Sequence, residues 1–174
     1  MQIDTRIQIN DGVETVSDLV WSAERRFDDG AALLGEGRFD GGLYLAGLSA
    51  EMLLKVACFR FRGNGPERSV KAQLYPARDW MKARAPGLDF EQFHSLRWWS
   101  TYLRLLREDA SDRMSAELES DLIERIETRL HANWCVSMRY RRLVIDKEVA
   151  WESLVAVSWL RQQSEMLGSR NASA

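Results

Sequence analysis

Apolar side chains recur at every third or fourth position between residues 40 and 61, the spacing of one face of an α-helix. The stripe consists of Leu43, Ala46, Gly47, Ala50, Leu53, Leu54, Ala57 and Phe61. Asp40 stands at its start as the expected N-cap. The small residues at positions 46, 47 and 50 would let a second helix approach closely. This is the strongest helical pattern in the chain.

Helical spacing also dominates the other segments. We predict helices over residues 16–35, 75–84, 93–108 and 115–137, with a last helix from a cap at Asp146 to residue 167. Ser17 or Asp18 is expected to cap the first of them. Only residues 5–9 alternate as a strand would, and the chain has three prolines. The sequence therefore predicts an all-α bundle of four to five long helices. The domain would span residues 16–167, between an N-terminal arm (1–15) and a C-terminal tail (168–174).

Large apolar side chains exceed what one face of each helix can hold. Trp98 and Trp99 are neighbours and cannot both point the same way from a helix, so one of them is expected to face a partner or a second layer. The last helix is apolar on almost every side, with Trp151 and Trp159 among its residues. Such a helix must be central to a bundle or lie in a subunit interface, which favours a homodimer.

Composition narrows the class of protein. The chain has 24 basic and 26 acidic residues, a net charge of −2, which disfavours a DNA-coating protein but permits a local basic patch. Cys58 and Cys135 form no metal-type or disulfide framework, and Cys58 is expected to be a buried free thiol. The start of the chain lacks a secretory pattern, and no apolar run long enough to span a bilayer is evident. We therefore expect a cytoplasmic protein without a membrane segment, a metal site or a bound cofactor.

Three motifs resemble the HEPN family of helical domains. Residues 37–55 read Gly-Arg-Phe-Asp-Gly-Gly-Leu-Tyr-Leu-Ala-Gly-Leu-Ser-Ala-Glu-Met-Leu-Leu-Lys, similar to the second-helix signature of that family. The triplet at residues 94–96, His-Ser-Leu, is similar to the His-Asp-Leu that opens a middle helix. Trp134, followed by Arg139 and Tyr140, is similar to the Trp…Arg-Tyr near the final helices. The resemblance covers residues 16–165 and depends on the order and spacing of the motifs.

The resemblance implies a helical bundle that forms a symmetric homodimer. Many HEPN proteins are RNA-cutting toxins or defence RNases, and others are partners of small nucleotidyltransferases. Active members carry Arg-x(4–6)-His before the last helix, often with Asn after the Arg, and two such motifs meet at the dimer groove. Here Arg139 matches the Arg, but Tyr140 replaces the Asn and no His follows. The motif is therefore degraded, because metal-free RNA cleavage needs a proton acceptor with a pKa near neutral.

A second Arg-x5-His match lies upstream, from Arg125 to His131. In a regular helix these side chains would point about 120° apart and lie about 9 Å apart along the axis. They would converge only if the helix broke between them, or across a dimer axis. Arg139, His131 and Arg125 are therefore the candidate catalytic residues.

The candidate ligand-binding residues form two groups. Arg139, Arg141 and Arg142 surround Tyr140, a mixture suited to RNA because Arg pairs with phosphate and Tyr stacks on a base. The second group lies on one shoulder of the predicted helix 40–61 and consists of Tyr44, Glu51 and Lys55. Glu51 and Lys55 are spaced for an ion pair within the helix, and Glu51 could instead accept from Arg139. His94 is expected to cap a helix or to form a hydrogen bond at its start.

Three functions follow from these patterns. The leading hypothesis is a HEPN-like module that binds RNA, a nucleotide or a protein partner in a prokaryotic toxin–antitoxin or defence system, with a nucleotidyltransferase-type antitoxin as one such partner. The first alternative is an active metal-independent endoribonuclease that uses Arg139 with His131 or His94. The second is a purely structural subunit that stabilises a partner through apolar helix faces.

Overall fold

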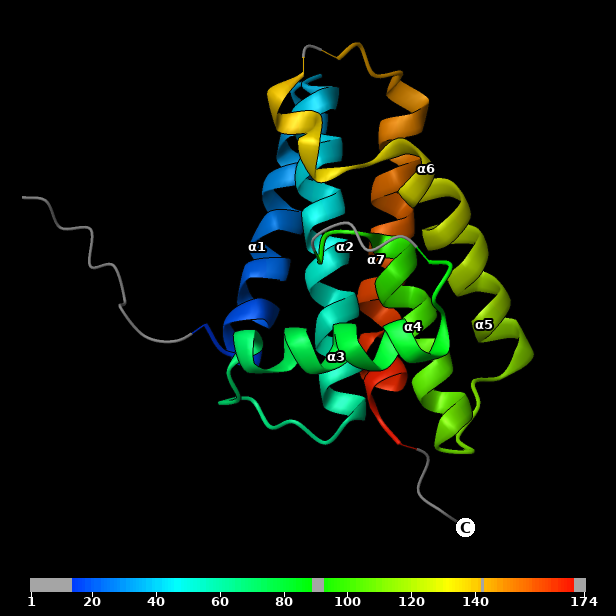
Figure 1. Cartoon of the computed structure of the whole chain (residues 1–174). Helices are drawn as coiled ribbons and strands as arrows, with labels where there is room; N and C mark the ends of the chain where they lie inside the picture. The colour runs from blue at the N-terminus through cyan, green and yellow to red at the C-terminus, as the bar shows by residue number, and fades with distance from the viewer. Residues whose placement is uncertain (1–13, 89–92, 142, 171–174) are drawn as a thin grey trace, which may run out of the picture.

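Figure 1 shows the chain as a computed structural model that describes residues 14–88, 93–141 and 143–170. Within those residues the protein is an all-α bundle, and the strand-like pairing found there is one antiparallel bridge between Thr15 and Ser69. The elements are α1 (Val16–Gly35), α2 (Phe39–Phe61), α3 (Val70–Arg84), α4 (Leu96–Asp109), α5 (Ala116–Leu122), the π-helix η1 (Ile123–Leu130), α6 (His131–Asn133), the 3₁₀-helix η2 (Val136–Tyr140) and α7 (Lys147–Gly168). The predicted all-α class is confirmed. The strand-like residues 5–9 lie outside the described part of the chain.

The two long helices α1 and α2 form an antiparallel hairpin, with α2 in the middle of the bundle and α1 at one side (Figure 1). The two helices approach closely where Gly30 faces Gly42. Any larger residue at position 42 would prevent this approach, since its Cβ would lie 2.5 Å from the Leu34 side chain. The buried Ser49 hydroxyl donates a 2.8 Å hydrogen bond to the Ala23 carbonyl across this contact. The helices α7 and α4 pack against α2, and α3 crosses the lower end of the bundle (Figure 1).

Several helix starts differ from the prediction by a few residues. α1 is capped by Thr15, not by Ser17 or Asp18, and Asp18 completes the capping box by accepting from the Thr15 backbone N–H. α2 begins one residue before Asp40, so that residue lies in the first turn and is not the cap. α3 begins five residues earlier than predicted, because Ser69 caps it. The periodicity located these helices, and local side-chain hydrogen bonds set their ends.

The predicted helix over residues 115–137 ends four residues early and is not α-helical throughout. The segment begins as α5, continues as the π-helix η1 and the short turn α6, and ends at Asn133. Trp134 and Cys135 are extended, and the chain then turns into η2. The residues from 134 onward therefore leave the axis of this helix and cross to α2.

Both tryptophans at the start of α4 are buried within the chain, so of the two expected alternatives a surface facing a partner is wrong and packing inside the bundle agrees with the structure. Trp98 and Trp99 contact each other edge to face, with ring centroids 4.7 Å apart, and both pack against Tyr102. Burial raises the pKa of the Tyr102 phenol to about 12. An aromatic cluster inside one chain thus accounts for these two side chains.

The last helix, α7, is only partly covered. It buries Leu154, Val157 and Leu160 against the rest of the bundle, while Trp151 and Val155 are exposed on its outer side. The expectation of a helix covered on most sides is therefore not met within a single chain. The homodimer stays a prediction.

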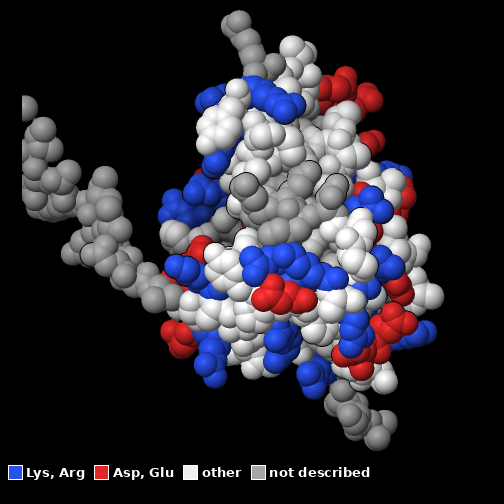
Figure 2. Space-filling view, viewed as in Figure 1, with Lys and Arg blue, Asp and Glu red and all other residues white. Residues whose placement is uncertain are grey.

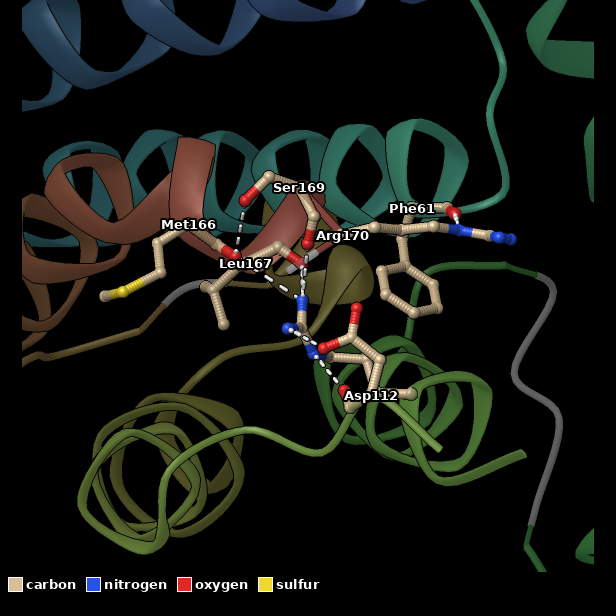
Figure 3. Close-up of polar contacts among 7 residues, drawn as sticks. Phe61, Asp112, Met166, Leu167, Ser169 and Arg170 are labelled. Carbon is tan, nitrogen blue, oxygen red and sulfur yellow. Dashed lines mark hydrogen bonds and ion pairs between the residues drawn. The ribbon is translucent and has the colours of Figure 1, made fainter. Parts of the chain in front are cut away.

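The lower end of the bundle is stabilised by one buried arginine, Arg107. Figure 3 labels Leu167, Ser169 and Asp112 among the residues around it. The Arg107 guanidinium, from α4, donates hydrogen bonds to the carbonyls of Leu167 (3.0 Å) and Ser169 (2.9 Å) at the end of α7. It also pairs with Asp112 at 3.2 Å and lies over the Phe61 ring at 4.8 Å. These carbonyls have no partner within α7, so Arg107 supplies the donors that the helix end lacks.

The helix α2 has the length and composition of a membrane-spanning segment, contrary to the expectation that no apolar run is long enough. In the structure, 78% of the apolar stretch of α2 that gives it this composition is buried within the bundle. The core helix of a soluble protein passes the same test, so this helix does not decide where the protein resides. The cytoplasmic location stays a prediction.

We expect Arg107→Met to lower the free energy of unfolding by about 3 kcal/mol, because buried carbonyls and Asp112 would lose their charged donor. Urea denaturation followed by circular dichroism measures this change. Arg113→Met is the matched control, since Arg113 forms an exposed ion pair with Glu108 and its loss should change stability little. Equal losses in the two variants would show that Arg107 does not stabilise the end of α7.

Candidate nucleic-acid interface

A cavity of about 440 Å³ lies where α6, η2 and the segment before α7 meet. Its polar lining includes His131, Asn133 and Arg141. The remaining lining residues are Ala132, Trp134, Cys135, Met138, Leu143 and Ile145. The lining residues follow one another closely in the sequence, from α6 through η2 to the segment before α7. They build one mainly apolar hollow with a few polar groups, which is the usual composition of a small-molecule or base-binding pocket.

Trp134 sets the position of this cavity. Its indole ring lies on α2 at Gly47, where a Cβ would be only 2.2 Å from the ring atoms Cδ1 and Nε1. The indole N–H donates a 3.0 Å hydrogen bond to the Tyr44 carbonyl. The glycine expected to admit a second helix therefore admits a tryptophan ring instead. Tyr44 contributes its backbone carbonyl to this anchor.

Arg139 and Tyr140, at the end of η2, form an exposed stack. The Arg139 guanidinium lies 4.5 Å from the centre of the Tyr140 ring, and Tyr140 is 77% exposed. Arg141 follows directly and lines the cavity. Figure 2 shows basic surface at this upper end of the molecule, with acidic surface set apart at the other side of the same end. The predicted residue Arg142 lies outside the described residues.

The two residues of the upstream Arg-x5-His match have different surroundings. Arg125 pairs with Asp121 at 3.4 Å and lies 5.6 Å from the centre of the Trp159 ring of α7. His131 comes after the π-helix and lines the cavity. Among the described residues, the arginine that shares this lining with His131 is Arg141, and neither Arg125 nor Arg139 does. The structure thus associates His131 with Arg141, which is not the arginine of the Arg-x5-His match.

Glu51 and Lys55 form a buried ion pair on α2, which confirms the pairing predicted from their spacing. The Lys55 ammonium lies 2.5 Å from Glu51 Oε1, and both side chains are less than one-tenth exposed. The other oxygen of Glu51 lies 3.0 Å from Nδ1 of His94. Glu51 is therefore occupied by Lys55 and His94, and the suggestion that it accepts from Arg139 is wrong. Ser95, not His94, caps α4.

Sequence reasoning missed the apolar half of the cavity. Met138, Leu143 and Ile145 carry no motif, and their common lining depends on the chain reversal after α6. Cys135 was identified only as one of two cysteines. The signal that could have revealed the reversal is Trp134 itself, a large residue followed by alternating polar and apolar positions. Among the described residues, no group of three or more His, Cys, Asp or Glu side chains could hold a metal ion.

We expect Gly47→Ala to destabilise the protein by about 1–3 kcal/mol, although alanine favours helix formation over glycine by about 1 kcal/mol. The added methyl group would push the Trp134 ring off α2 and break its hydrogen bond to Tyr44. Thermal unfolding measures the loss. Gly35→Ala is the control, because nothing lies within 4 Å of a Cβ there. A stability equal to that of the control would contradict the proposed anchor.

The two cysteines should differ sharply in reactivity. Burial raises the pKa of the Cys58 thiol, which therefore stays protonated and inaccessible, whereas Cys135 is partly exposed in the cavity lining. We expect one thiol of the native protein to react quickly with Ellman's reagent at pH 8 and the second only after unfolding. Cys135→Ser should remove the fast phase. A fast phase that persists in Cys135→Ser would mean that Cys58 is accessible.

Comparison with known proteins adds no family to this description. No protein-family model, curated protein or solved structure matches the chain. The HEPN resemblance stays a prediction that depends on the motifs at residues 37–55, 94–96 and 134–140.

Proposed function

We propose that this protein binds RNA or a nucleotide at the end of the bundle formed by α6 and η2. The observation that carries the proposal is the exposed Arg139–Tyr140 stack directly beside a cavity that Arg141 lines. Phosphate and an unpaired base are the two chemical groups that such an arrangement accommodates together. Both groups occur in RNA and in free nucleotides.

The cavity supplies the surroundings that a base requires. Met138, Leu143 and Ile145 provide apolar contact, and a volume of about 440 Å³ is within the range of pockets that hold small organic ligands. Asn133 and His131 offer hydrogen-bonding groups at its edge. A base could enter the cavity while the adjoining phosphate meets Arg141.

The exposed stack supplies a second contact. One face of the Tyr140 ring lies against the Arg139 guanidinium, and the side chain is largely in solvent, so a further base could stack on it. Base stacking on an aromatic side chain contributes about 1–3 kcal/mol. The two arginines add electrostatic attraction to phosphate in a chain whose net charge is −2.

A metal-independent endoribonuclease is the second candidate function. One observation favours it, namely that His131 and Arg141 line the same cavity. An imidazole can accept the proton of a ribose 2′-hydroxyl, and an arginine can stabilise the charge that develops on the phosphate. In this arrangement Arg141, not Arg139 or Arg125, would act with His131.

We expect Tyr140→Ala to weaken binding of a fluorescein-labelled single-stranded RNA by roughly tenfold, the loss of one stacked base. Arg139→Ala and Arg141→Ala should weaken binding and reduce its dependence on salt. Fluorescence anisotropy at several salt concentrations measures both effects. Arg113→Ala removes an equal charge beyond the end of α4 and should leave the affinity nearly unchanged.

The same RNA, incubated with the protein in EDTA and separated on a gel, distinguishes the two functions. Intact RNA favours the binding module. Cleavage that disappears in His131→Ala favours the endoribonuclease. Absence of binding in the unaltered protein, or equal binding by Tyr140→Ala, would refute the proposed site.

A further inference from the structure

A second exposed stack of tyrosine and arginine lies on α3. The Arg78 guanidinium is 5.0 Å from the centre of the Tyr75 ring, and Tyr75 is 49% exposed. Arg78 also pairs with the exposed Asp79. The arrangement repeats the Arg139–Tyr140 stack of η2, although the two pairs lie on different elements and have different sequence spacing.

The residues beside this stack are unusually constrained. Phe93 contacts the Tyr75 ring edge to face at 5.7 Å and has a φ of 67°, a conformation that bulky side chains rarely adopt. Its carbonyl accepts a 2.9 Å hydrogen bond from the Trp99 indole N–H. Backbone strain of this kind costs about 1–3 kcal/mol and tends to occur at functional sites. The strained conformation holds the Phe93 ring against Tyr75.

His94 connects this stack to α2. Its Nδ1 atom lies 3.0 Å from the buried Glu51 carboxylate, while its side chain remains 40% exposed. Glu51 lies seven residues along α2 from Tyr44, whose carbonyl anchors Trp134. Seven residues of helix correspond to about 10 Å. Glu51 and Tyr44 therefore lie on the same side of α2, about two helical turns apart.

The charge of α3 favours the same ligand as the η2 end. The helix contains four basic residues, Lys71, Arg78, Lys82 and Arg84, and one acidic residue, Asp79, a net charge of +3 in a chain of net charge −2. In Figure 2 a basic band crosses the lower half of the face that carries basic surface at its upper end. Both η2 and α3 lie toward this face in Figure 1.

We propose that Tyr75 and Arg78 form a second base-stacking site and that the ligand is a single-stranded RNA that contacts both η2 and α3. The inference rests on the proposed function, because the η2 end supplies the first contact. Tyrosine rings can stack only on bases that are not already paired and stacked in a duplex, which selects a single strand. His94, fixed by Glu51, lies next to this second site and can hydrogen-bond to the strand.

The test compares two lengths of fluorescein-labelled single-stranded RNA by anisotropy: one of about three nucleotides, enough for the η2 end, and one of about twelve, enough for both sites. Tyr75→Ala should weaken binding of the longer RNA by roughly tenfold and leave the short one unaffected, whereas Tyr140→Ala should weaken both. Tyr75→Phe keeps the ring and should bind like the unaltered protein. Circular dichroism confirms that the variants fold.

The outcomes separate the two proposals. Normal binding of the longer RNA by Tyr75→Ala, together with weakened binding by Tyr140→Ala, would overturn the second site and leave the first intact. Duplex RNA of the same length that binds as tightly as the single strand would overturn the preference for single strands. If the unaltered protein binds neither RNA, or if Tyr140→Ala has no effect on either, the proposed function fails and this inference fails with it.

Discussion

The contact between Trp134 and Gly47 determines where the candidate site forms. A side chain at position 47 would occupy the space of the indole ring, and the indole N–H has its partner in a carbonyl of the same helix. This anchor fixes the chain immediately after α6, so the following residues turn over α2 instead of continuing along the helix. The same contact places η2 over α2, with Met138 in the cavity lining and Tyr140 exposed.

The π-helix η1 is the second constraint on this region. It places Arg125 against Trp159 and leads into His131 at the cavity. π-helical turns are rare and frequently occur at functional sites. At the other end of the bundle, Arg107 fixes the end of α7 through backbone carbonyls. The end of the molecule with the C-terminus of α7 is thus stabilised by buried polar contacts. At the end with η2, arginine and tyrosine side chains are exposed instead.

The sequence predicted most of the helices but only part of the site. The apolar stripe of α2, the extent of α1 and the pairing of Glu51 with Lys55 depend on residues three or four apart, which a helix brings together wherever it lies. Arg139, Tyr140 and Arg141 were identified from their composition. The contact between Glu51 and His94 was not predicted. These residues are 43 positions apart in the sequence and meet only because α4 packs on α2.

Local periodicity and capping therefore determined that the chain is helical, and approximately where each helix begins. They could not determine where the helix after residue 115 stops, since residues 131–137 keep a composition compatible with a helix. The tertiary structure decided this, because burying the Trp134 ring against Gly47 is possible only if the chain leaves the helix at Asn133. The cavity depends on the same contact, since His131 and Asn133 before the turn line it together with Met138, Leu143 and Ile145 after the turn.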